Sequence, residues 1–429
     1  MKRSIIDKLI AFFIPLPIFI DPTSPILLAQ SKLAEGAVAF PISLFLLPLS
    51  FMLLFMTKSE RYVSKLSYIL LILITLFVIY FLSLGVVSSF ENVAALMYAI
   101  QWVIPFLWIP YFYNLIHSEN ISLFMRFFEK GAILSILYIF LSGFLEILTY
   151  GALQDMGRVT QNLILKGQYQ LYVYTPTIIA YSTLMCNFIY VSNAIKRNVL
   201  FVVVFNLLAF LSLVFLGARE AIVVYILGMA FFLLSYRAKY TLSYIIFLLI
   251  VSLVIVSNVE YIINYFDLEE FRALNKFQNM TSEGQAFGAR DVMILKYLEM
   301  LASDPMFAMR SLPPELSFPE LGIHAPSAHN YYVDVWAWGG GVSAILMYLY
   351  LSILLFLSIY IVFKVMKYGG IACIRGGEVV VFASAYFMIS FLLISNNINV
   401  PLRQPLTGAF FSLISIFVIF RGRVNFVEE

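Results

Sequence analysis

The chain has 429 residues and a formal net charge of +3, and 62% of its residues are hydrophobic whereas only 12% are charged. Soluble domains carry about 25% charged residues, so this composition excludes an ordinary water-soluble protein. The small net charge also gives no indication of a nucleic-acid partner. Both cysteines lie in or beside apolar segments, which predicts neither a disulfide framework nor a thiolate metal site.

Apolar runs long enough to span a bilayer recur along the chain. A hydrocarbon core needs about 20 apolar residues in helical form, and KLSYILLILITLFVIYFLSLG is one such run. The expected fold class is therefore all-α, a polytopic transmembrane bundle of about 12 spans. The first is expected to be a retained helix, because no small-x-small cleavage motif follows the apolar N-terminal segment. The spans are expected near residues 9–28, 36–56, 66–86, 93–115, 131–150, 173–194, 198–216, 220–236, 241–258, 339–363, 377–395 and 405–421.

Basic residues are distributed unevenly between the connecting segments. Most of the 27 lysines and arginines fall in one alternate set, which includes both termini. Because positive charge concentrates on the cytoplasmic side, both termini are expected in the cytoplasm and the long loop outside. Three regions result: residues 1–258 with nine spans, the extracytoplasmic loop 259–338, and residues 339–429 with three spans.

Two parts of the long loop are expected to be structured. FGARDVMILKYLEMLASDP predicts an amphipathic helix. Its predicted apolar face consists of Ile294, Leu295, Leu298, Leu301 and Ala302. The following RSLPPELSFPELGIHAPSAHN is rich in proline and has no helical period, so it predicts an irregular, structured crossing back to the membrane. Such a backbone must either be buried in protein or line a wet cavity. A functional site is expected there.

Four arginines are expected on or near the outer side: Arg219, Arg290, Arg310 and Arg403. A guanidinium near apolar spans is costly unless it has a partner or a function. Its rigid fork matches phosphate oxygens, so several arginines on one face predict a phosphate site. The alternatives are an ion pair with Glu220 or a snorkelling side chain for Arg219, and a structural role for Arg310.

The three histidines differ in their expected positions. His117 is expected to be a solvated loop residue on the cytoplasmic side, whereas His324 and His329 lie in the outer loop. A neutral imidazole can take a proton from a sugar hydroxyl as a general base. The alternative for His329 is a structural residue that caps the following helix. No metal is expected, because the loop has no cysteine and no HExxH pair.

The order of these features resembles one family of membrane enzymes. Arg219 follows a short Gly-Ala turn between two spans, Arg290 opens a helix in the long outer loop, and His329-Asn330 precede a helix that begins with glycine. This arrangement resembles the O-antigen polymerase and O-antigen ligase superfamily of bacterial inner-membrane glycosyltransferases. The resemblance is strongest over residues 212–345. Trp338 and Ser343 stand where the family usually has an acidic residue and a second glycine.

The resemblance implies metal-independent, inverting glycosyl transfer on the periplasmic face, without a cofactor. The donor would be a glycan on undecaprenyl pyrophosphate, His329 the base, and Arg219 and Arg290 the groups that stabilise the leaving pyrophosphate. Asp21 is a competing base, although a turn-forming role before Pro22 explains it as well. Further substrate contacts would come from His324, Asn330, Tyr331, Tyr332, Arg310 and Arg403. The aromatic residues Tyr331, Tyr332, Trp336 and Trp338 would stack on sugars or anchor at the membrane interface.

Polymerase is the expected activity within this class, because the sequence departs from ligase-like details. The acceptor would then be the next lipid-linked repeat unit, and a chain-length regulator protein is a candidate partner. A ligase, which transfers the glycan to the lipid A core, is the alternative. A flippase of lipid-linked oligosaccharide is an alternative of another class, but the mid-span segments carry almost no charge for a transport cavity.

Overall fold

The computed structural model describes most of the helical part of the chain. It covers residues 3–17, 19–20, 40–55, 65–90, 94–118, 120–150, 175–191, 195, 197–216, 219–236, 290–305, 316–318, 323–325, 327–374, 376–398 and 400–420. The expected span at 241–258 and the first part of the long loop lie outside the described residues. The same is true of Asp21 and Arg310.

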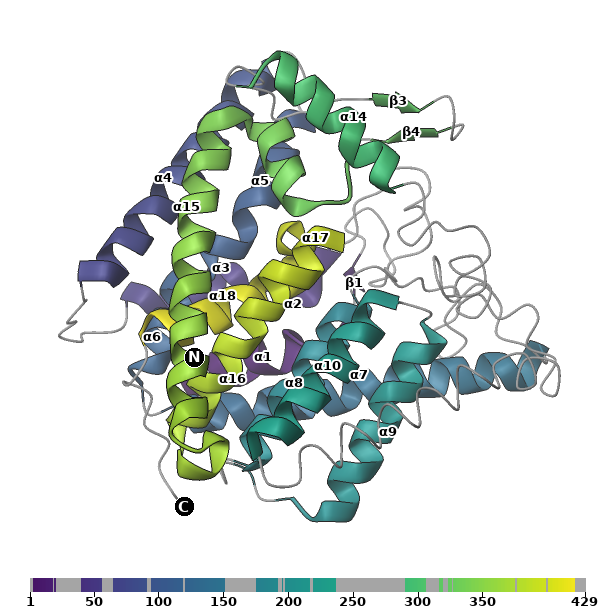
Figure 1. Cartoon of the computed structure of the whole chain (residues 1–429). Helices are drawn as coiled ribbons and strands as arrows, with labels where there is room; N and C mark the ends of the chain where they lie inside the picture. The colour runs from purple at the N-terminus through teal and green to yellow at the C-terminus, as the bar shows by residue number, and fades with distance from the viewer. Residues whose placement is uncertain are drawn as a thin grey trace.

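Helices dominate the described structure (Figure 1). The N-terminal half contains α1 (Arg3–Phe13), β1 (Phe19–Ile20), β2 (Phe40–Pro41), α2 (Ile42–Phe45), α3 (Leu47–Phe55), α4 (Lys65–Ser89), α5 (Ala94–Leu107), α6 (Ile109–Ile116), α7 (Ile121–Tyr150), α8 (Thr175–Val191), α9 (Val199–Phe215) and α10 (Arg219–Tyr236). The C-terminal half contains α14 (Arg290–Ser303), β3 (Leu316–Phe318), β4 (Ile323–Ala325), α15 (Tyr331–Lys367), the 3₁₀ turn η4 (Gly370–Cys373), α16 (Gly377–Ser390), the π-helical turn η5 (Phe391–Ser395), α17 (Asn396–Ile398), the 3₁₀ turn η6 (Pro401–Arg403) and α18 (Pro405–Ile419). Strands β1 and β2 pair antiparallel, as do β3 and β4.

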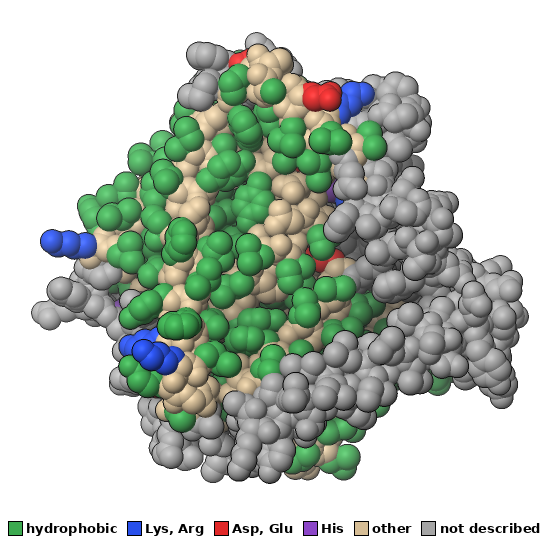
Figure 2. All heavy atoms as spheres, viewed as in Figure 1, with side chains coloured by type: hydrophobic (Ala, Val, Ile, Leu, Met, Phe, Trp, Pro, Cys, Tyr) green, Lys and Arg blue, Asp and Glu red, His purple; other side chains and the backbone are tan. Residues whose placement is uncertain are grey.

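The described part of the chain contains five helices that are long and apolar enough to cross a membrane. They are Lys65–Ser89, Tyr98–Ile116, Ile121–Leu145, Tyr331–Lys367 and Gly377–Ile398. The outer faces of α4 and α15 are apolar: Tyr68 is 61% exposed and Phe356 is 71% exposed. Figure 2 shows apolar side chains covering most of the described part of one face, with only a few charged groups among them. An exposed apolar surface of this extent is typical of a protein that faces lipid.

Helix α18 lies at the centre of the bundle. Every residue from Leu406 to Ile419 is buried, and the helix packs against α5, α6 and α16. Its serine and threonine hydroxyls are bonded to carbonyl oxygens, as Ser412 is to Pro105 of α5 and Ser415 is to Phe411. Small and hydroxylated residues of this kind let apolar helices pack closely.

Helix α15 folds back on itself at the glycine run noted in the sequence. Gly340 has φ 70° and ψ −178°, a conformation that favours glycine. The Tyr348 hydroxyl donates to the Tyr332 carbonyl, 16 residues away, at 2.5 Å. Along a straight helix these residues would lie about 24 Å apart, so α15 consists of a short arm, 331–339, and a long arm, 341–367 (Figure 1). The long arm begins near the expected start of a span at residue 339, but the short helical arm was not expected.

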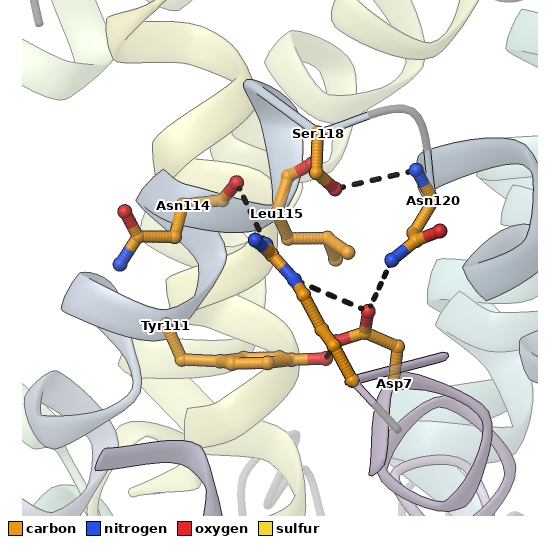
Figure 3. A network of polar contacts seen from close by, with 7 residues as sticks. Asp7, Tyr111, Asn114, Leu115, Ser118 and Asn120 are labelled. Carbon is orange, nitrogen blue, oxygen red and sulfur yellow. Dashed lines mark hydrogen bonds and ion pairs between the residues drawn. The ribbon is translucent and has the colours of Figure 1, made fainter. Parts of the chain in front are cut away.

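A buried carboxylate holds α1 to its neighbours (Figure 3). Asp7 has no exposed surface, and it accepts hydrogen bonds from the Tyr111 hydroxyl and the Asn120 side-chain amide, each at 2.9 Å. Arg3 lies 3.6 Å from the same carboxylate and also donates to the Asn114 carbonyl. The helix is therefore fixed to α6 and to the start of α7 by polar contacts at the edge of the apolar core.

Two sequence-based predictions of helices need correction. The expected first span at 9–28 is wrong, because α1 ends at Phe13 and is followed by Pro15 and Pro17, which cannot donate to a helical ladder. A helix at the predicted place in the long loop is confirmed as α14, but its predicted apolar face is only partly correct. Leu295 is 61% exposed; the buried residues are Met293, Tyr297 and Leu301, of which only Leu301 belonged to the predicted face. Apolar residues occur all around this helix, so their periodicity does not define one face.

Candidate functional site

The candidate site lies where the short arm of α15 begins. Asn330 caps this helix: its side-chain oxygen accepts from the backbone N–H groups of Tyr332 and Val333 at 3.0 and 3.2 Å. Its side-chain amide donates to the Asn397 carbonyl at 3.3 Å and so ties the cap to α17. The helix-capping role considered for His329 therefore belongs to Asn330, and the His329 imidazole does not cap the helix.

His329 occupies an electropositive, largely buried position immediately before the cap. Burial and the positive charges of Arg290 and Arg403 lower its pKa from 6.5 to about 4. The imidazole is therefore neutral at physiological pH and has a nitrogen lone pair that can accept a proton. The backbone of His329 is also unusual, with φ 53°, whereas all other positive φ values in the described residues belong to glycines.

Arg290 is the first residue of α14. Its Nη1 donates to the Ile398 carbonyl at the end of α17, at 2.6 Å. The bond joins the loop helix to the segment that also contacts Asn330. Because the charge of Arg290 acts on His329, the loop helix contributes directly to the electrostatics of the site.

Arg403 approaches from η6, between α17 and α18. Its guanidinium lies 4.8 Å from the centre of the Trp338 ring and 5.8 Å from that of Trp102. Its Nε and Nη1 atoms are buried and find no hydrogen-bond acceptor among the described residues. The indole N–H groups of both tryptophans and the Tyr331 hydroxyl, all buried, also lack partners there. Buried donors are nearly always satisfied in folded proteins, so this cluster suits an oxygen-rich ligand or bound water.

An apolar cavity opens beside the helix start. Its volume is about 500 Å³, and it lies between the two arms of α15, α14 and η5. Its lining residues are Leu298, Tyr332, Val333, Trp336, Tyr348, Leu351, Ser352, Leu355 and Leu392. The hydroxyl of Tyr332 is turned to the Leu392 carbonyl at 2.6 Å, and the indole N–H of Trp336 donates to the Pro305 carbonyl at 2.7 Å. The polar atoms of these two rings are thus occupied, which leaves an apolar wall.

The structure brings some of the predicted site residues together. His329, Arg290 and Arg403 share one electrostatic environment, with Asn330, Tyr331 and Tyr332 immediately after the histidine. The predicted sugar-stacking or interfacial role of Trp338 is wrong, because this ring is only 2% exposed and packs against Trp102. Tyr331 is likewise 1% exposed, with its ring beside Trp102.

The other predicted residues are placed less fully. Arg219 is the first residue of α10, and His324 lies in β4 opposite Ser317 of β3. The described structure fixes only the backbone of these two residues. Among the described residues, no group of three or more His, Cys, Asp or Glu side chains could hold a metal ion.

Two contributors to the site were not predicted from the sequence. Trp102 comes from α5, more than 200 positions before Trp338, and no local pattern relates the two. Asp334 is fully buried and accepts two hydrogen bonds from the residues just before His329. An acidic residue in an otherwise apolar helical turn was the available signal.

Comparison with known proteins identifies no related family or protein. No protein-family model matches the chain, and a search of curated proteins finds no significant match. The assignment of a function therefore depends on the residues and geometry described above.

Proposed function

We propose that this chain is a glycosyltransferase of bacterial surface-polysaccharide assembly that acts as an O-antigen polymerase. The observation that carries the proposal is the neutral imidazole of His329 beside Arg290 and Arg403, where buried N–H groups of Arg403 find no acceptor among the described residues. A proton acceptor next to unused anion-binding donors is what a transfer from a phosphate-linked sugar needs. The proposed location is the inner membrane, with the site facing the periplasm and both termini in the cytoplasm.

In the proposed reaction, a sugar hydroxyl of the acceptor attacks the anomeric carbon of the donor glycan. The bond from that carbon to the pyrophosphate oxygen breaks, and undecaprenyl pyrophosphate leaves with the bonding electrons. His329 takes the proton of the attacking hydroxyl. Arg290 and Arg403 stabilise the negative charge that develops on the leaving group, with Arg219 as a further candidate. Attack opposite the leaving group inverts the anomeric centre.

The charges of the site link donor binding to base strength. With no anion present, burial and then the charges of the two arginines lower the pKa of His329 and make the imidazole a weak base. A bound pyrophosphate offsets these positive charges and moves the pKa back toward its ordinary value. The base then strengthens only when the donor occupies the site, which limits proton transfer to the productive complex.

The apolar cavity supports a lipid-linked donor. It begins at Tyr332 and Val333, within four residues of His329, and its walls are mostly leucine, valine and aromatic carbon. A volume of about 500 Å³ is enough for several isoprene units of a polyprenyl chain, but not for the whole chain. The rest of such a lipid would lie in the surrounding bilayer.

Transfer by the full-length protein in nanodiscs tests the proposal. The sole substrate would be undecaprenyl-pyrophosphate oligosaccharide, with EDTA present, and wild type would be compared with His329→Ala, Arg403→Ala and the control His117→Ala. We expect a ladder of longer lipid-linked glycans that persists in EDTA, survives in the control and is lost in the two site variants. Transfer that appears only after lipid A core is added would replace polymerase by ligase. If no glycan is transferred to either acceptor, the glycosyltransferase activity is refuted and the flippase alternative is favoured.

A further inference from the structure

The backbone of His329 needs support from its surroundings. A left-handed conformation at a residue other than glycine costs on the order of 1 kcal/mol or more. His329, at φ 53°, is the only such residue in the described part of the chain. It also precedes the helix directly, so this conformation determines where the imidazole points.

One buried carboxylate supplies that support. Asp334 has no exposed surface; its Oδ1 accepts from the backbone N–H of Ala328 at 2.7 Å, and its Oδ2 accepts from the Ser327 hydroxyl at 2.5 Å. The Ser327 oxygen in turn accepts from the backbone N–H of His329 at 3.0 Å. A continuous series of hydrogen bonds thus leads from Asp334 through Ser327 to the residue with the strained backbone.

Asp334 is itself held in a fixed position. It lies in the first turn of α15, and its backbone N–H donates to the Asn330 carbonyl at 2.9 Å. Asn330 caps that turn with two further hydrogen bonds. The carboxylate therefore acts from a rigid helix end on the loop that precedes it, and charged hydrogen bonds of this kind are about twice as strong as neutral ones.

We propose that Asp334 is a positioning residue, which acts through Ser327 to set the orientation of the His329 imidazole relative to Arg290 and Arg403. The role in transfer rests on the proposed function, whereas the conformational role does not. Asp334 is not assigned a contact with substrate. Its effect on transfer is exerted only through the geometry of the histidine.

The conformational role can be measured without any glycan substrate. Diethyl pyrocarbonate modifies neutral imidazoles, and the chain has only three histidines, so each can be quantified by peptide mass spectrometry. Asp334→Asn removes the negative charge and the acceptor oxygen that the Ser327 hydroxyl donates to. Ser327→Ala removes the link to His329 while keeping the carboxylate. Each loses a buried hydrogen bond to a charged or constrained group, so we expect modification of His329 at pH 7 to accelerate on the order of tenfold.

Matched controls separate a local effect from general loosening. Asp7→Asn alters another buried aspartate that accepts two side-chain hydrogen bonds, but on α1. It should leave the reactivity of His329 unchanged. His117, bonded to the Tyr113 carbonyl at 2.7 Å, is an internal control in every sample. Ser327→Thr keeps the hydroxyl, so His329 in this variant should be modified as slowly as in the wild type.

Two results would overturn the positioning role. One is wild-type reactivity of His329 in both Asp334→Asn and Ser327→Ala; the other is an equal acceleration at His117, which would indicate general destabilisation. If Asp334→Asn does not fold, the comparison of Ser327→Ala with Ser327→Thr tests the positioning role without it.

Transfer kinetics provide the second readout. In correctly folded Asp334→Asn and Ser327→Ala, kcat should fall on the order of tenfold while the KM for the lipid-linked donor stays within about twofold, because the arginines remain in place. Threonine at position 327 should recover most of the kcat. If the wild type shows no transfer but the variants show accelerated modification of His329, the proposed function is refuted and the positioning role is supported. Normal transfer with accelerated modification would refute the catalytic part of the inference.

Discussion

The charge state of His329 gives the most specific prediction of the structure. Its pKa is lowered from 6.5 to about 4, first by burial, then by Arg290, then by Arg403. A difference of this size corresponds to about 3 kcal/mol between the two protonation states. Because Arg403 is the third cause, we expect Arg403→Gln to raise the pKa of His329 by less than about one. Arg290→Gln should raise it by at least as much.

NMR of protein labelled at histidine Cε1 measures this pKa directly. The three histidines give three resonances, which His117→Ala and His324→Ala assign. In the wild type we expect the His329 resonance to keep its neutral shift from pH 8 down to about 5. Titration of wild-type His329 between pH 6 and 7, or no change in either arginine variant, would show that the imidazole is not in the electropositive pocket. The reasoning behind the base and phosphate sites would then fail together.

Three further outcomes follow from the packing. Because its pKa is lowered, His329 binds a proton less readily in the folded state than in the unfolded state, so its contribution to stability is present above pH 6.5 and is lost as the pH falls toward 4. Between pH 7 and 5, the free energy of unfolding of the wild type should fall by about 2 kcal/mol more than that of His329→Asn. Thermal or denaturant unfolding measures this difference. Gly339→Ala would place a methyl group against Ser343 at the fold in α15. We expect the melting temperature to fall by an amount equivalent to about 1–3 kcal/mol. An unchanged melting temperature would contradict the tight packing at this position. Arg197 binds Glu129 through two hydrogen bonds of 2.8 and 3.0 Å, and Glu129 is only 2% exposed. Arg197→Ala should therefore cost about 3 kcal/mol in unfolding experiments, and more than Glu129→Ala, since only the former leaves a buried charge unpaired.

Hydropathy and the positions of arginine and histidine predicted the class of fold and part of the site. The apolar runs predicted a helical chain, and the described residues include five helices long and apolar enough to cross a membrane. Helix α14 lies where the sequence predicted a helix in the long loop. The family resemblance implied that His329 and Arg290 belong to one site, and the structure places them close enough for the charge of Arg290 to lower the pKa of His329. The 12-span count, the topology and the role of Arg219 remain predictions.

The remaining features depend on contacts that a linear pattern does not contain. Apolar residues lie on every side of α14, so its buried face had no periodic signal. The fold in α15 was visible only as Gly339, Gly340 and Gly341, and glycine runs also occur in straight membrane helices. The contact of Trp102 with Trp338 and Arg403 depends on how α5, α15 and η6 converge, which follows from packing of the whole bundle.

The fold in α15 explains how a polar site can form next to a helix that is apolar enough to cross a membrane. The long arm belongs to that apolar helix, whereas the short arm turns back and places its capped N-terminus, with Asp334 and His329, against α17 and the loop helix. The backbone N–H groups of Ala328 and His329, just before this arm, are bonded to Asp334 and Ser327, so they are satisfied within the protein. The same arm forms one wall of the apolar cavity. A proton acceptor, two guanidinium groups and an apolar surface therefore meet at one helix end. This is the combination of chemistries that a charged headgroup on a long isoprenoid chain requires.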